Sequence, residues 1–146
     1  MSKSNTFEND LLNLIFNATP IANLADDAAS SPLTNLYVSL HTADPGEAGN
    51  QTTNEVSLAA YVGYDRVAVA RSGSGWTITA NSVSPVAAID FPECTAGTGA
   101  TITHFAVGTA STGTGKVLYS GTVTPNITIA ANVTPRLTTA STITEE

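Results

Sequence analysis

The spacing of hydrophobic and polar positions changes near residue 35. Before that point, between residues 5 and 17, apolar residues recur at intervals of three and four, as on one face of a helix. Asn5 and Glu8 stand in the register of a capping box at its start, and Pro20 helps to end it. The pattern therefore predicts a short N-terminal helix, followed over residues 21–33 by a weak second helix or a linker.

The apolar face of this helix is wider than the stripe of an ordinary surface helix. Its large apolar side chains, named the helix face below, are Phe7, Leu11, Leu12, Leu14, Ile15 and Phe16. A face this wide needs cover, either from the chain's own β-domain or from another subunit. We take the helix face as the candidate assembly interface.

From residue 36 onward the hydrophobic period is two, which is the signature of half-buried strands. Residues 35–41 and 64–71 alternate most clearly, which places Ser39 and His41 on the polar face of the first strand and Arg66 on the outward face of the second. Loops rich in Gly and Ser at 72–75 and 111–115 each predict a hairpin, and residues 127–130 predict a further strand. Short strands about ten residues apart predict a mainly β, single-domain antiparallel β-sandwich that is jelly-roll-like. Residues 1–34 are expected to form a helix and linker arm, and residues 35–146 the β-sandwich domain.

Composition narrows the class of protein. The 146 residues are 42% hydrophobic and 12% charged, and 23 Thr with 13 Ser make up about a quarter of the chain, which favours strands. A net charge of −7 with five cations leaves no basic patch for nucleic acid, and the apolar runs are too short to span a membrane. Cys94 is the single cysteine, so no internal disulfide can form.

Charge is distributed unevenly along the chain. No carboxylate occurs between Glu93 and Glu145, and the charged residues in that span are Lys116 and Arg136. A free surface is usually richer in charge. Either a Thr-covered sheet faces water here, or a neighbouring subunit covers the face.

Candidate catalytic residues do not form a recognisable set. The sequence contains His41, His104 and Cys94 but no Gly-x-Ser-x-Gly elbow, and we expect these three residues to be structural. Residues 112–116 resemble a phosphate-binding loop, but the first glycine and the hydroxyl residue after the lysine are missing, so they predict a hairpin tip. We expect no catalytic residues and no cofactor.

Clustered acids invite a metal or hydrolase interpretation. Asp44, Glu47 and Asn50 lack the spacing of a calcium loop. Pro45 predicts a turn here instead, with Gly46 and Gly49 at positive φ. The acid pairs Asp26 with Asp27 and Asp90 with Glu93 carry nothing in sequence that separates their pKa values. We expect no metal site and no acid-base pair.

Aromatic residues offer one binding alternative. Trp76, Tyr61 and Tyr64 could form a platform on which a sugar ring stacks. Core packing is the competing interpretation, because Trp76 shares one face of its strand with Ile78.

The segments from Asn35 to Gly49 and from Tyr64 to Val69 resemble a family of small tailed-phage virion proteins. Members of that family are described as capsid cement or decoration proteins, or as tail-fibre proteins. The resemblance extends to further segments, so it covers nearly the whole chain: residues 4–16, 81–85, 89–92, 105–108 and 133–137. It implies a jelly-roll-like β fold and a structural role.

These observations predict a non-enzymatic cement protein on the capsid exterior of the virion, made in the bacterial host cytoplasm. Its expected partners are the major capsid protein and further copies of itself, as a dimer or another homo-oligomer, with neither nucleic acid nor membrane. An acidic protein suits the outside of the shell, because like charges repel it from the packaged genome. The alternative is a tail or tail-fibre component that binds a host-surface glycan.

Overall fold

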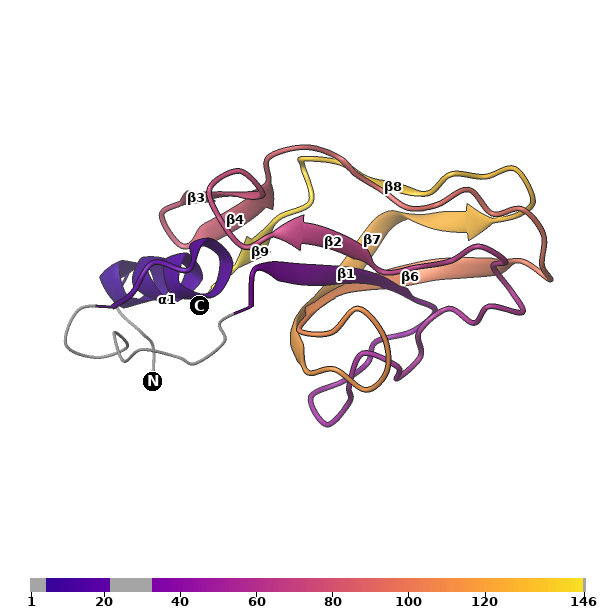
Figure 1. The fold of residues 1–146 in the computed structure, drawn as a ribbon, viewed down its shortest axis with the longest axis horizontal. Coiled ribbons are helices and arrows are strands. Elements are labelled where there is room, and N and C mark those ends of the chain that lie inside the picture. The colour runs from indigo at the N-terminus through magenta and orange to yellow at the C-terminus, as the bar shows by residue number, and fades with distance from the viewer. Residues whose placement is uncertain (1–4, 22–32, 146) are drawn as a thin grey trace. The chain divides into compact units, whose positions relative to one another are not determined.

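The structure is a computed structural model that describes residues 5–21 and 33–145 (Figure 1). Among these residues the elements are α1 (Asn5–Asn17), β1 (Asn35–His41), β2 (Val67–Ala70), β3 (Trp76–Thr79), β4 (Ser82–Pro85), β5 (Ile89–Asp90), β6 (Ala100–Gly108), β7 (Val117–Ile129), β8 (Arg136–Leu137) and β9 (Ile143–Thr144). The fold is mainly antiparallel β with one short N-terminal helix, consistent with a β-sandwich. The predicted fold class is confirmed.

The chain divides into two compact units, each built from separated segments. One unit comprises residues 1–35, 69–88 and 137–146, and the other comprises residues 36–68 and 89–136. We call them the helix unit and the sheet unit. The predicted division between residues 34 and 35, into an arm and a β-sandwich domain, stays a prediction.

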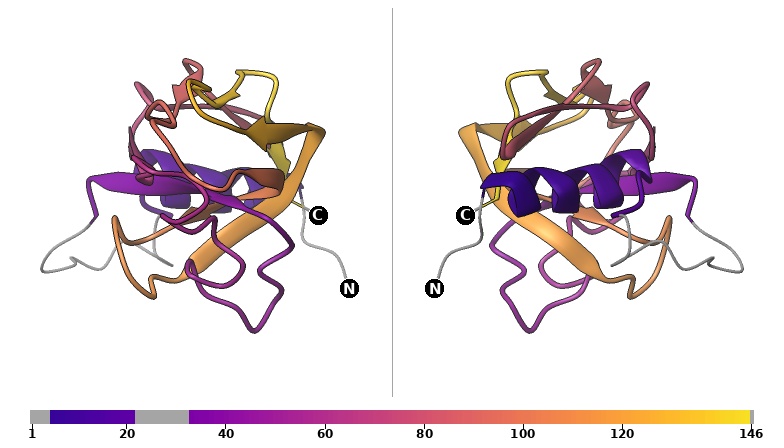
Figure 2. Two further views of the ribbon diagram at one scale, coloured as in Figure 1. Left: turned by 90° about the vertical axis from the view of Figure 1, so that its right-hand side faces the viewer. Right: turned by 90° about the vertical axis from the view of Figure 1, so that its left-hand side faces the viewer.

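The four-stranded sheet has the order β2-β1-β6-β7, and the sheet unit contains β6, β7, nearly all of β1 and the first half of β2. β1 pairs antiparallel with β6, so that Leu40 lies opposite Phe105 and His41 opposite His104. β6 then pairs with β7, which appears as one long orange band in Figure 2, and this confirms the hairpin predicted around residues 111–115. β7 also includes residues 127–129, which the sequence assigned to a separate strand.

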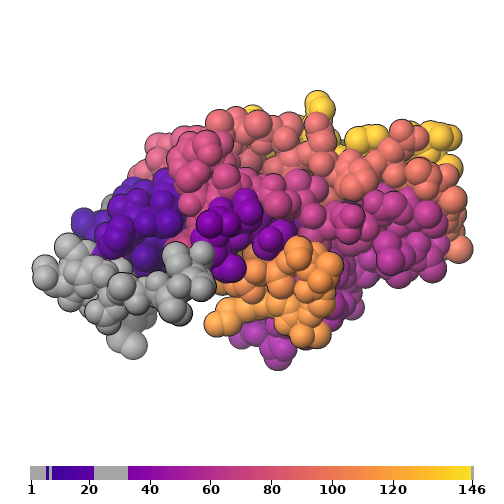
Figure 3. All heavy atoms as spheres, viewed as in Figure 1, coloured from indigo at the N-terminus to yellow at the C-terminus, as the bar shows by residue number. Residues whose placement is uncertain are grey.

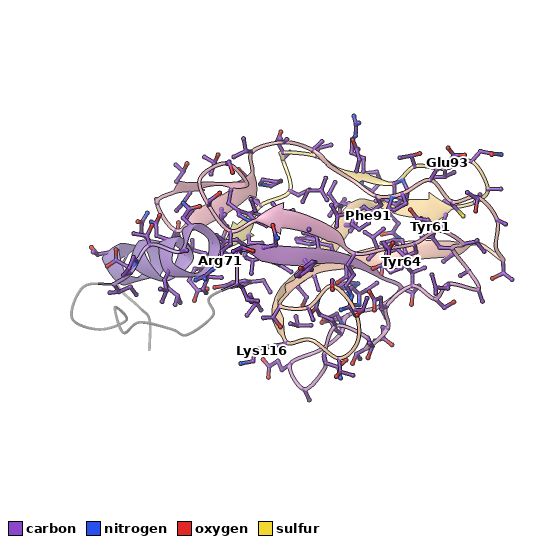
Figure 4. All side chains as sticks on the ribbon, in the orientation of Figure 1. Tyr61, Tyr64, Arg71, Phe91, Glu93 and Lys116 are labelled. Carbon is purple, nitrogen blue, oxygen red and sulfur yellow. The ribbon has the colours of Figure 1, made fainter. Side chains whose placement is uncertain are left out.

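The apolar core of the sheet unit contains three neighbouring aromatic rings, of which Tyr64 and Phe91 are stacked and Tyr61 is tilted by 50° relative to Tyr64. Tyr64 lies between Tyr61, with ring centroids 5.3 Å apart, and Phe91, at 6.4 Å (Figure 4). The Tyr61 hydroxyl donates a hydrogen bond to the Pro92 carbonyl, and burial raises the pKa of Tyr61 to about 12. Large aromatic side chains therefore fill this core, and the hydroxyls of Tyr61 and Tyr64 are hydrogen-bonded.

The helix unit is built around a three-stranded sheet with the order β3-β4-β9. β3 pairs with β4 across a tight turn in which Ala80 has a φ of 54°. The hairpin predicted across residues 72–75 is therefore wrong, since β2 and β3 belong to different sheets. Residues 72–75 form a bend instead, and a Cβ at Gly75 would lie 2.1 Å from the Ala70 carbonyl oxygen, so the bend requires glycine.

α1 packs on the strands of the helix unit through its buried side. The Phe16 and Trp76 rings meet edge to face with centroids 4.7 Å apart, and the Asn9 side chain donates a 2.7 Å hydrogen bond to the Ala80 carbonyl. Arg71 then donates from its guanidinium to the carbonyls of Leu14 and Ile15 in the last turn of α1 (Figure 4). Those carbonyls lack partners within the helix, and a cation there also complements the helix dipole.

This packing buries part of the helix face. Leu12 and Phe16 are completely buried, whereas Leu11, Leu14 and Ile15 are half-buried. The side chain of Phe7 and residues 22–32 of the predicted linker lie outside the described part of the chain. The assembly interface stays a prediction, and the half-buried residues are the members of it that a partner reaches while α1 remains packed.

Replacing Arg71 with Met tests whether this cation holds α1 in place. Arg71→Met keeps the aliphatic stem but removes the donors, and we expect it to lower the free energy of unfolding by about 1–3 kcal/mol. Urea unfolding followed by circular dichroism measures the change. The matched control is Arg136→Met, because Arg136 forms an exposed ion pair with Asp90 and its loss should change little. Equal destabilisation by both variants would contradict the assignment.

Candidate functional site

Two loops of the sheet unit meet through a buried polar cluster. One is the long loop over residues 42–56, which follows β1, and the other is the hairpin loop over residues 109–116, between β6 and β7. The backbone N–H of Gln51 donates a 2.9 Å hydrogen bond to the Gly115 carbonyl, which brings the two loops into contact. In Figure 3 the orange spheres of the hairpin loop lie against purple spheres of the long loop.

Arg66 is the centre of this cluster. Its guanidinium forms a bidentate pair with Glu55, with Nε to Oε1 and Nη2 to Oε2 both 2.7 Å. The same group donates to the carbonyls of Ala110, at 3.0 Å, and Gly113, at 2.8 Å. The Glu55 hydrogen bonds raise the pKa of Arg66. Both side chains are nearly buried, so one guanidinium joins the long loop, the hairpin loop and the start of β2.

Tyr64 extends the cluster into the aromatic core. Its hydroxyl donates to Glu55 Oε1 at 2.9 Å and accepts a 3.1 Å hydrogen bond from the Leu40 amide. Burial raises the pKa of Tyr64, so the hydroxyl stays protonated and remains a donor to the carboxylate. Glu55 therefore accepts hydrogen bonds from both Arg66 and Tyr64.

Gln51 fills the space beneath the hairpin loop. Its side-chain carbonyl accepts a 2.9 Å hydrogen bond from the Ala110 amide, and the side chain is completely buried. A Cβ at Gly108 would lie 2.2 Å from Gln51 Cδ, and one at Gly115 would lie 2.1 Å from Gln51 Oε1. These two glycines therefore make room for the glutamine side chain, whatever their backbone angles.

His41 is held neutral inside the same region. Its Nδ1 donates to the Thr53 carbonyl at 2.9 Å, so Nε2 accepts the hydrogen bond from the Ser39 hydroxyl at 2.8 Å. Burial lowers the pKa of His41. The sequence placed Ser39 and His41 on the half-exposed face of their strand, but both are completely buried because the long loop covers them.

The other residues considered for catalysis are dispersed. His104 bonds Thr103 Oγ1 through Nδ1 at 2.8 Å, and Cys94 is buried with its thiol 3.2 Å from the Ala96 carbonyl oxygen. Residues 112–116 form the predicted hairpin tip, with Gly113 at a φ of +73°. His104 and Cys94 do not contact each other, and the hydroxyl that His104 meets belongs to its neighbour in sequence, Thr103.

The predicted turn at Asp44 is present. Asp44 Oδ1 accepts a 2.9 Å hydrogen bond from the Gly46 amide, and Gly46 has a φ of +70°. Gly49 does not adopt a positive φ, contrary to expectation, and is required because a Cβ there would lie 2.0 Å from the Pro45 carbonyl oxygen. Among the described residues no three His, Cys, Asp or Glu side chains gather closely enough to hold a metal ion.

The remaining acids and aromatics have structural surroundings. Asp90 pairs with Arg136 in an exposed, bidentate contact that lowers the pKa of Asp90, while Glu93 is exposed. The predicted pair Asp26 and Asp27 lies outside the described residues. The sugar platform is wrong, because its three aromatic residues are buried, Trp76 at 3%, Tyr61 at 0% and Tyr64 at 8% exposure.

Sequence reasoning missed the residues that form the cluster. Arg66 was expected to point outward from an alternating strand, and Glu55 and Gln51 were not singled out. One signal was available, since Arg66 is one of only five cations and lies next to a run of small and β-branched residues. Its carboxylate partner is eleven residues away in sequence, and nothing in the spacing identifies it.

Comparison with known protein families identifies the family of this chain. The family described as Podophage GP4 fiber I protein gp80 matches residues 2–144. The chain belongs to this family. It is thus a bacteriophage structural protein, and the family description names a fibre protein rather than a capsid cement protein. A comparison with curated proteins found no match.

The side chains of the polar cluster bond within the chain, as expected for a structural protein of the gp80 fibre family. Arg66, Glu55 and His41 form hydrogen bonds with one another or with the backbone of the two loops. A shallow hollow of about 180 Å³ lies beside them, lined in part by Leu58, Tyr64 and Thr112. Within the described residues no helix has the length and apolar character needed to span a bilayer.

The buried neutral state of His41 predicts a pH dependence of stability. Because the folded pKa lies below the unfolded value of about 6.5, the unfolded chain takes up a proton first as the pH falls. Stability is therefore lost below about pH 6.5. Melting temperatures should fall less between about pH 7 and pH 5 in His41→Gln than in the natural chain.

The control for this measurement is Ser39→Ala, which removes the hydroxyl partner but keeps the titrating ring. It should retain a steep fall in melting temperature over the same pH range. Identical pH dependence in His41→Gln and the natural chain would show that His41 is not the responsible group.

Proposed function

We propose that this chain is a non-enzymatic structural subunit of a phage tail fibre. The observation that carries the proposal is the family match, which extends over residues 2–144 and whose description names a fibre protein. That description favours the tail location over the capsid exterior expected from the sequence.

The surroundings of the reactive side chains support a structural role. An active site needs a reactive group that reaches its substrate. His41 and Cys94 are buried, and the guanidinium of Arg66 is already engaged by a carboxylate and two carbonyls. These groups stabilise the fold and are not presented to a substrate.

The expected partners of such a subunit are other proteins of the virion, including further copies of itself. A surface of hydroxyl and apolar side chains with few charges suits burial between subunits, and residues 94–144 contain no carboxylate. Neither nucleic acid nor a membrane is proposed as a partner. A sugar site is not part of the proposal, because the aromatic rings considered for it are buried.

Cryo-electron microscopy of virions labelled with an antibody fragment against this protein tests the location. We expect the fragment on the tail fibres, and none on virions assembled without the protein. Virions that lack it should also keep the thermal stability of their shell while adsorbing poorly to the host. Label on the shell, with early release of DNA from virions lacking the protein, would restore the capsid cement hypothesis and reject the fibre proposal.

A further inference from the structure

The last residue of β1 is a histidine that faces a second histidine in the neighbouring strand. The regular pairing of β1 with β6 places His41 directly opposite His104. On its other side, His41 forms an antiparallel bridge with Glu55 of the long loop. Side chains of directly opposite residues in antiparallel strands lie on the same face, with Cβ atoms about 5 Å apart. The two imidazole rings and the Glu55 side chain are therefore neighbours, and we call these three residues the histidine row.

The long loop holds the His41 ring in its neutral form. The ring is completely buried, and its Nδ1 donates to the Thr53 carbonyl of that loop. Nε2 accepts a 2.8 Å hydrogen bond from the Ser39 hydroxyl. A proton on Nε2 would require this hydroxyl to turn to the Ala106 carbonyl oxygen, which is 3.4 Å away and too far for a strong hydrogen bond. The hydrogen bonds around the ring thus suit the neutral form better than the charged one.

The charges around the ring also disfavour its protonation. Burial has the largest effect and lowers the pKa of His41, and the neighbouring charges of Arg66 and His104 act in the same direction. The Thr53 carbonyl and Glu55 act in the opposite direction, but Glu55 is already paired with Arg66. Protonation of both histidines would place like charges directly opposite each other, which is destabilising. The histidine row is therefore stable while His41 is neutral.

Residues 42–54 are the part of the long loop that can uncover the ring. Glu55 is held by its bidentate pair with Arg66, so this end of the loop stays fixed. Gln51 ties the segment to the hairpin loop, but its Nε2 is buried and has no hydrogen-bond partner among the described residues. A buried donor without an acceptor costs free energy, and withdrawal of Gln51 returns this donor to water. Opening of residues 42–54 would thus hydrate both the His41 ring and the Gln51 amide.

We propose that the histidine row makes residues 42–54 acid-sensitive, so that this segment opens from the face of β1 increasingly often below about pH 6.5 while the strands of the sheet unit stay paired. Protons bind the open form, in which the His41 ring lies in water. Opening exposes His41 and Gln51 and separates the long loop from the hairpin loop. This inference goes beyond the fibre proposal and does not depend on it. It also goes beyond the loss of stability predicted above, because it places the acid-sensitive opening in one segment.

Hydrogen exchange of the natural chain at about pH 7.5 and about pH 5 tests the proposal. The measured quantity is the protection factor, which corrects for the pH dependence of chemical exchange. We expect the protection factors of residues 42–54 to fall by about fivefold to thirtyfold at the lower pH. About thirtyfold is the limit for one histidine with a pKa of about 6.5 in the open form.

Low concentrations of urea distinguish opening of this segment from unfolding of the whole chain. Opening of a segment exposes little surface, so the protection factors of residues 42–54 should stay nearly constant up to about 1 M urea at pH 5. Those of β6 should fall over the same range, because global unfolding exposes much more surface.

Two variants identify the titrating group. His41→Gln removes the ring but keeps an amide that can donate to the Thr53 carbonyl, and its protection factors in residues 42–54 should differ by less than about twofold between the two pH values. The matched control, His104→Gln, keeps the His41 ring and removes the opposing charge, so it should show a smaller fall than the natural chain. Nitrogen resonances of the His41 ring in the natural chain need no variant, and they should titrate below about pH 6.5 in the closed form.

Four outcomes would overturn the proposal. The first is unchanged protection of residues 42–54 between the two pH values, and the second is an equal fall in His41→Gln and the natural chain. The third is an equal response of residues 42–54 and β6 to urea, which would mean that acid unfolds the whole unit. The fourth is titration of the His41 ring at its ordinary pKa in the closed form.

Discussion

The bidentate pair between Arg66 and Glu55 is the interaction on which the sheet unit depends. One guanidinium holds a carboxylate of the long loop and two carbonyls of the hairpin loop, and Tyr64 connects that carboxylate to the aromatic core. A buried ion pair contributes little net stability compared with apolar packing, but loss of one partner leaves a buried charge. Its main consequence is therefore to fix where the two loops lie.

The same arrangement places several of the chain's polar side chains in hydrogen bonds within the sheet unit. His41 and Cys94 are buried, and their side chains form hydrogen bonds with Ser39, Thr53 and Ala96. Thr122, Thr124 and Thr128 of β7 are exposed in the sheet unit, whereas Leu11, Leu14 and Ile15 of the helix face are half-buried in the helix unit.

Sequence periodicity predicted the elements whose residues interact locally. The helix over residues 5–17, the strand over residues 35–41 and the hairpin around residues 111–115 follow from spacing and turn residues. The predicted hairpin at residues 72–75 failed because glycine there permits a bend that takes the chain into a different sheet. The polar cluster was not predictable, since Arg66 contacts residues 44 and 47 positions away and spacing does not encode such pairings.

Hydrogen exchange measured by mass spectrometry on Arg66→Met tests the central claim most directly. If Arg66 fixes both loops, amides in residues 50–56 and 109–116 should exchange at least about tenfold faster, because hydrogen bonds to a charged group are lost. Arg71→Met, which acts on α1, should leave those amides unchanged, and Arg66→Lys should show an intermediate effect if the methionine variant fails to fold. Unchanged protection of both loops in Arg66→Met or Arg66→Lys would contradict the account.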